Sequence, residues 1–181
     1  MWKYTNISWL KAKFLELKAF CFHVLGKQPA RRVVLAELLA LRLAHGADAS
    51  AMAAVLEALA ETYRAEDHRS LLSVDALLEK AITLRLSKLP ASANFHVGRL
   101  LHRRCQIKRR LNLLQEALQL AEEALTVYSL TRPLCYERLP LTRMLIELHQ
   151  SQGSCRRARE LTEQLQALSA PITWRSRRLS Y

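Results

Sequence analysis

The sequence has few residues that interrupt helices. Its 181 residues include only four glycines and five prolines, and no run alternates valine or isoleucine with polar residues as a strand would. The residue types that favour helix, such as leucine, alanine, glutamate and arginine, dominate instead. Hydrophobic residues make up 50% of the chain, which is enough for a continuous core in about one domain. The composition therefore predicts an all-α fold.

Closely spaced cysteines and long apolar runs are also absent. The four cysteines are too scattered for the disulfide framework of a small secreted protein: Cys21, Cys105, Cys135 and Cys155. No apolar run approaches the roughly 20 residues needed to span a bilayer, and the start of the chain lacks a secretory signal. We therefore expect reduced thiols, no transmembrane segment and a cytoplasmic protein.

Acidic residues are outnumbered by basic ones. The chain has 28 Lys and Arg against 16 Asp and Glu, a net charge of +12. The net charge is +6 over residues 1–34, −2 over 35–91, +4 over 92–132 and +4 over 133–181. Such a charge attracts nucleic acid, an anionic membrane or an acidic protein surface, and charge alone does not choose among them.

Apolar spacing predicts about eight helices, of which the clearest two lie between Leu134 and Ser169. Gly153 separates the two helices and is expected to end the first in a left-handed conformation. Each carries one apolar stripe: Leu141, Leu145 and Leu148 on the first, and Ala158, Leu161, Leu165 and Leu168 on the second.

The chain is expected to begin with a helix over residues 6–25, capped by Asn6, with Pro29 beyond its end and a second helix over 31–45. One apolar stripe runs along the first helix: Leu10, Phe14, Leu17, Cys21 and Val24. Three candidate docking residues lie outside this stripe: Trp2, Trp9 and Phe20. Three interpretations stay open. The helix packs over the end of the domain, docks on a partner, or contacts anionic lipid through Lys3, Lys11, Lys13 and Lys18.

The sequence repeats itself at a step of about 42 residues. Segments around Ala76, Ala117 and Ala158 recur at 41-residue steps, longer than the ~34 residues of an ordinary tetratricopeptide repeat (TPR). From Ser50 to Ser169 the pattern resembles the long TPR variant of kinesin light chains and of the helical sensor domains of large bacterial transcription activators. The middle repeat departs from that pattern in three places: Asn112 replaces the turn glycine, Cys105 a small residue and Lys108 an aromatic.

This resemblance implies an α-solenoid of stacked antiparallel helical hairpins, with a concave groove along the first helix of each hairpin. It places groove-lining residues in three repeats: Glu57, Glu61 and Arg64 in the first, Arg99, His102, Gln106 and Arg109 in the middle one, and Arg143, Glu147 and Gln150 in the last. Arginines there would bind carboxylates of an acidic peptide. The alternative is that these residues are solvated charges on exposed helix faces.

The sequence carries no recognisable signature of catalysis. His102 and Cys105 stand three residues apart on one helix, but no CxxC or HxxxH supports a zinc site. Gly26-Lys27 lacks the other residues of a phosphate-binding loop. We therefore expect no enzymatic activity, no metal and no cofactor.

Three regions are expected: a basic aromatic helix over residues 1–29, a repeat domain over 30–170 and a flexible tail over 171–181. The tail contributes further candidate docking residues: Trp174, Arg175, Arg177 and Arg178. The predicted function is a non-enzymatic adaptor that binds an acidic or extended segment of another protein. A nucleic-acid-associated basic module and a subunit of a large assembly are the alternatives.

Overall fold

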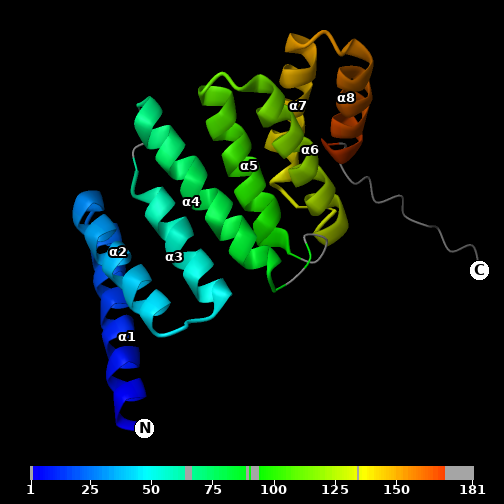
Figure 1. Cartoon of the computed structure of the whole chain (residues 1–181). Helices are drawn as coiled ribbons and strands as arrows, with labels where there is room; N and C mark the ends of the chain where they lie inside the picture. Colours follow the sequence, from blue (N-terminus) through cyan, green and yellow to red (C-terminus); the bar gives the residue numbers. More distant parts are fainter. Residues whose placement is uncertain (1, 64–66, 89, 91–93, 134, 170–181) are drawn as a thin grey trace, which may run out of the picture. The chain divides into compact units, whose positions relative to one another are not determined.

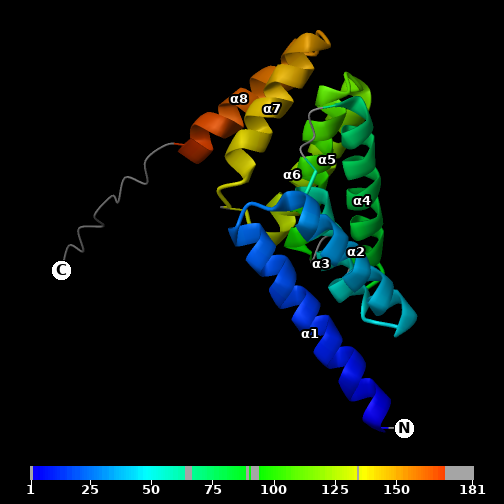
Figure 2. The same cartoon turned by 90° about the vertical axis from the view of Figure 1, so that its left-hand side faces the viewer.

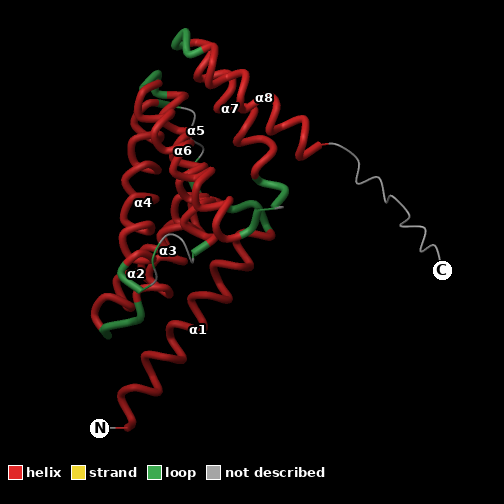
Figure 3. Tube along the Cα trace, turned by 90° about the vertical axis from the view of Figure 1, so that its right-hand side faces the viewer, coloured by secondary structure: helices red, strands yellow, loops and turns green. Residues whose placement is uncertain are grey.

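The computed structural model describes residues 2–63, 67–88, 90, 94–133 and 135–169, and its secondary structure within these ranges is entirely helical (Figures 1 and 3). The described residues form eight helices: α1 (Trp2–Val24), α2 (Gln28–Ala44), α3 (Ala49–Glu61), α4 (His68–Leu86), α5 (Phe95–Arg110), α6 (Leu114–Thr131), α7 (Arg138–Ser151) and α8 (Cys155–Ser169). The all-α prediction and the expected number of helices are confirmed.

The helices pair in chain order as antiparallel hairpins: α1 with α2, α3 with α4, α5 with α6, and α7 with α8. Residues 1–133 form one compact unit and residues 134–181 a second. Within the first unit, neighbouring hairpins meet where α2 packs on α3 and α4 packs on α5. Hairpins therefore stack on one another in this unit, as the repeat pattern predicts.

Three of the hairpins share one kind of turn. Each turn has a residue with positive φ at its centre: +68° at Gly26, +60° at Asn112 and +74° at Gly153. The next N–H donates a hydrogen bond of 2.8–2.9 Å to the carbonyl five residues back, as in the Schellman motif that ends many helices. Asn112 thus adopts the conformation of the glycine it replaces, which asparagine tolerates better than most residues.

The turn of the first hairpin fits the same sequence repeat as the turns of the later hairpins. Gly26 lies 86 residues before Asn112, which is two steps of 43 residues. Pro29 lies beyond the end of α1, as predicted, but within the first turn of α2, which begins at Gln28 and not at residue 31. Proline is tolerated there because an N–H in the first turn has no helical partner. Asn6 lies within α1, which begins at Trp2, so it is not the predicted cap.

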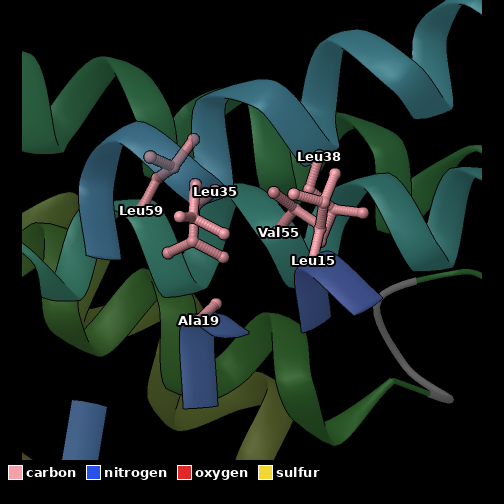
Figure 4. Close-up of a cluster of buried hydrophobic side chains, with 7 residues drawn as sticks. Leu15, Ala19, Leu35, Leu38, Val55 and Leu59 are labelled. Carbon is pink, nitrogen blue, oxygen red and sulfur yellow. The ribbon is translucent and has the colours of Figure 1, made fainter. Parts of the chain in front are cut away.

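The core of the first unit shows that α1 packs through an unexpected face. Leu15 and Ala19 of α1 are only 3% and 5% exposed and lie against side chains of α2 and α3 (Figure 4). The predicted stripe of α1 contains Phe14 and Leu17, and each of these is 62% exposed. An apolar stripe is normally the packed face of a surface helix, but α1 has apolar residues on two opposite faces.

Small residues allow close packing on the second helices of the later hairpins. Ala117 and Ala124 of α6 and Ala158 of α8 are all buried. His149 on α7 is also buried. These positions carry the helix-to-helix contacts that the repeat pattern requires.

The turn at Asn112 is testable by substitution. Asn112→Gly should leave the free energy of unfolding unchanged or slightly raised, whereas Asn112→Val should lower it by about 1–2 kcal/mol, because a side chain with a branched Cβ is strained at positive φ. Urea denaturation followed by circular dichroism measures both. Leu113→Val is the matched control, since Leu113 has φ −89° and is 39% exposed. Equal stability of Asn112→Val and Leu113→Val would contradict the role of the turn.

Candidate partner-binding surface

Helix α5 is the most basic element of the described chain. It carries six Lys or Arg residues and no acidic residue. Helical geometry directs these cations to different sides, so they divide into a group that packs against neighbouring helices and a group that reaches solvent. The cations of the first group are Arg104 and Lys108, and those of the second are Arg99, Arg103, Arg109 and Arg110.

The inward group forms an ion-pair network across three helices. Arg104 donates two hydrogen bonds to Asp75 of α4, at 2.8 and 3.3 Å. Lys108 Nζ lies 3.0 Å from the Asp75 carboxylate and 2.8 Å from that of Glu116 on α6. Arg104 also lies 3.3 Å from Glu79. The network neutralises two cations of α5 and links α4, α5 and α6.

Burial and pairing act against each other in this network. Burial disfavours the ionised form of Asp75, but hydrogen bonds and charges from Arg104 and Lys108 outweigh it, so the pKa of Asp75 is lowered. Burial likewise disfavours the charged forms of both cations, and their acidic partners raise the pKa of Arg104 and of Lys108. All three groups are therefore charged at neutral pH.

The predicted groove residues of α5 form the α5 stripe, which we define as Arg99, His102, Gln106 and Arg109. Arg99, Gln106 and Arg109 are exposed, whereas His102 is half-buried. The His102 ring meets the edge of the Tyr128 ring at a centroid distance of 6.5 Å, and its Nε2 lies 3.3 Å from Gln106 Nε2. The stripe therefore combines two exposed arginines with a histidine that is held against α6.

Gly98 explains why α5 lies so close to α6. A Cβ atom at Gly98 would lie 2.8 Å from the ring of Tyr128, which is fully buried. Phe95 packs on the same ring at a centroid distance of 5.3 Å. This contact fixes α5 on α6 and thereby holds the α5 stripe in place.

The other predicted groove residues have different surroundings. Arg143, Glu147 and Gln150 are exposed on α7, in the second unit. Two acidic residues of α3 are engaged within the first unit, where Glu57 pairs with Arg85 at 2.6 Å and Glu61 with Arg31 at 3.2 Å. Arg64 lies outside the described residues.

The structure describes the side chains of only two of the candidate docking residues. Trp9 and Phe20 on α1 are 57% and 61% exposed. The side chain of Trp2 and the tail residues Trp174, Arg175, Arg177 and Arg178 lie outside what the structure describes.

A cleft between the first three helices was missed by the sequence reasoning. It has a volume of about 290 Å³ and is lined by residues that include Phe20 of α1, Arg31 and Arg42 of α2 and Ala54 of α3. Arg42 is held there by hydrogen bonds to Glu16 and to the carbonyl of Ala51. Spacing along the chain carries no signal for this cleft, because its walls come from three helices.

Cys105 of α5 has surroundings unsuited to nucleophilic chemistry. Burial raises the pKa of the Cys105 thiol to about 12, with Arg109 acting weakly in the opposite direction. The thiol is therefore protonated at neutral pH and is a poor nucleophile. Among the described residues, no three His, Cys, Asp or Glu side chains are grouped as metal ligands, and no helix is long and apolar enough to cross a membrane.

These hairpins, with their glycine-type turns and buried small residues, define a TPR-like helical-repeat fold. Two crystal structures of a putative kinesin light chain from Podosopora anserina, described as nearly identical TPR-like repeats, share it. The first has a TM-score of 0.67 and covers 88% of this chain and 77% of its own. The second, a glutamine-to-methionine variant of that protein, has a TM-score of 0.68 and covers 88% and 76%. Each is 19% identical to this chain. No family model and no curated protein matches the sequence.

The ion-pair network predicts a large effect of neutralising Asp75. Asp75→Asn should lower the free energy of unfolding by about 2–3 kcal/mol, because it leaves Arg104 and Lys108 buried without their shared partner. Because the pKa of Asp75 is lowered by folding, its contribution is complete above about pH 4 and is lost as pH falls further. The difference between the two proteins in urea denaturation should therefore shrink below about pH 4.

Glu123→Gln on α6 is the matched control for Asp75→Asn, since Glu123 is exposed. It removes one carboxylate charge without touching the network and should change stability by less than about 0.5 kcal/mol. Similar losses from both substitutions would show that net charge, and not the network, determines the effect.

Proposed function

We propose that this protein is a non-enzymatic protein-protein interaction module, which binds an acidic or extended segment of a partner along the α5 stripe. The α5 stripe supplies the proposed contacts of the first unit, and the exposed residues Arg143 and Gln150 of α7 are a separate set of proposed contacts in the second unit. We place the protein in a reducing compartment such as the cytoplasm, with its four cysteines as thiols. A TPR-like fold is in general a scaffold for protein partners, and this supports the class of function.

The distribution of charge on α5 is the observation that carries the choice of ligand. Two of its six cations are neutralised inside the fold by Asp75, Glu79 and Glu116. The remaining four are arginines, and among the described residues Arg99 forms no ion pair. An exposed arginine offers a planar fork of donors that matches a carboxylate. An acidic segment is thus the protein ligand that the stripe suits best.

The test uses a ten-residue peptide rich in Asp and Glu, labelled with a fluorophore and titrated with the whole protein at 150 mM salt. Wild type should bind it, and Arg99→Glu should weaken binding at least tenfold, because an attractive charge becomes repulsive. Lys80→Glu on α4 makes the same change of charge at an exposed site off the stripe and should alter affinity less than twofold. Circular dichroism checks that both variants keep their helicity.

The same titration distinguishes the proposed function from the alternative of a nucleic-acid-associated module. A 20-nucleotide RNA and a duplex DNA replace the peptide, at salt concentrations from 50 to 200 mM. Binding of nucleic acid that falls steeply with salt, together with no binding of the acidic peptide, would replace the proposed function by a nucleic-acid-associated one. Equal peptide binding by wild type and Arg99→Glu would move the binding surface away from α5.

A further inference from the structure

Helix α1 has an uncovered apolar face opposite the one that packs in the core. Leu10, Leu17 and Val24 on this face are 56%, 62% and 67% exposed. Figure 2 shows α1 at the front of the first unit, with no other helix of that unit over its outer side. By contrast, the exposed residues of α8 are mostly polar, among them Arg156, Arg157, Arg159, Glu163 and Gln164. The exposed face of α1 is therefore apolar, whereas that of α8 is polar.

The spacing on this face is that of a coiled coil. We name as the α1 seam the residues Leu10, Phe14, Leu17, Cys21 and Val24, all of which are exposed. They follow one another at intervals of four, three, four and three residues, the d-a-d-a-d pattern over two heptads. A seam of this width matches one partner helix, and is narrower than the apolar face by which a helix packs on a globular core.

The residues beside the seam indicate what kind of helix fits. In the same heptad frame, Lys11 and Lys18 occupy e positions, and Lys13 and Phe20 occupy g positions. Charges at e and g select the partner in coiled coils. A second copy of this chain would place lysine beside lysine in either orientation, which is unfavourable. A helix with glutamate or aspartate at these positions would meet each lysine with an opposite charge.

The surroundings of the lysines count against a lipid surface as the occupant. Lys13 pairs with Glu16 at 2.8 Å and Lys11 with Glu37 at 3.3 Å. These two ion pairs reduce the number of lysines beside the seam that are available to an anionic membrane, whose attraction grows with each free cation. Among the described residues Lys18 forms no ion pair, and it is the cation best placed to contact a partner.

We propose that the α1 seam binds an amphipathic helix of a partner protein as a two-stranded coiled coil, and that this helix carries apolar residues at a and d positions and acidic residues at e and g. Two heptads are fewer than the roughly three to four that identify a free coiled coil. Here α1 is already folded against α2 and α3, so only the partner helix is ordered on binding. This surface is separate from the α5 stripe and does not depend on it.

The probe is a synthetic 21-residue helix with leucine at a and d and glutamate at e and g, labelled and titrated with the whole protein at 150 mM salt. A second peptide with lysine at e and g is otherwise identical. Wild type should bind the glutamate peptide at least tenfold more tightly than the lysine peptide. Lys18→Glu should weaken the first interaction and strengthen the second, which a purely apolar contact would not do.

The double variant Phe14→Ser, Leu17→Ser removes the centre of the seam and should weaken binding of the glutamate peptide at least tenfold. The matched control is Leu130→Ser on α6, which removes an apolar residue that is as exposed as Phe14 and Leu17 and lies outside the seam, and it should change affinity less than twofold. Both sites are exposed, so circular dichroism should show unchanged helicity. Arg99→Glu should leave this binding unaltered, which separates this proposal from the proposed function.

Four results would overturn the proposal. The first is equal affinity for the two peptides, and the second is full binding by the Phe14→Ser, Leu17→Ser variant. The third is that wild type is a dimer in sedimentation equilibrium and the variant is a monomer, which would make a second copy of the chain the occupant. The fourth is co-sedimentation with phosphatidylserine vesicles that the variant abolishes, in the absence of binding to the glutamate peptide, which would make the occupant a lipid surface.

Discussion

A hairpin of two helices has more apolar surface than its two members can cover for each other. The structure of the first unit follows from this constraint, because each hairpin must bury its remaining apolar residues against the next. Leu15 of α1 meets Leu35 of α2 and Leu59 of α3 in one cluster, so the core belongs to no single hairpin. The short turns at Gly26 and Asn112 make this possible, since they hold the paired helices antiparallel.

Charge takes the place of apolar contact at one junction between hairpins. Where α4 packs on α5, Asp75 accepts hydrogen bonds from Arg104 while Lys108 bridges to Glu116 of the following helix. A buried network of this kind adds little stability over apolar packing, although removing one partner is costly. Its consequence for recognition is that α5, with six cations, presents only four of them outward.

Several features of the fold were predictable because they depend on a few neighbouring residues. The glycine-type conformation of Asn112 follows from its place in the repeat, and the buried alanines Ala117 and Ala158 follow from helical spacing. The face of α1 was not predictable in this way. Leu10, Phe14 and Leu17 are at least as apolar as the packed residues Leu15 and Ala19, yet they are the exposed ones, because contacts with α2 and α3 decide which face of α1 is buried. For the candidate site, the choice of Arg99, Gln106 and Arg109 came from the resemblance to TPR repeats, and their side chains are exposed, but the contact of His102 with Tyr128 required α6.

The sequence by itself determined the helices, their repeat of about 42 residues and the turns between them, since these depend on local propensity and on apolar period. Tertiary structure decided which cations of α5 are neutralised and which face of α1 is left uncovered. The physical reason is that both outcomes depend on side chains from other helices. Asp75 lies 29 residues before Arg104 in the chain and becomes its partner only when α4 packs on α5.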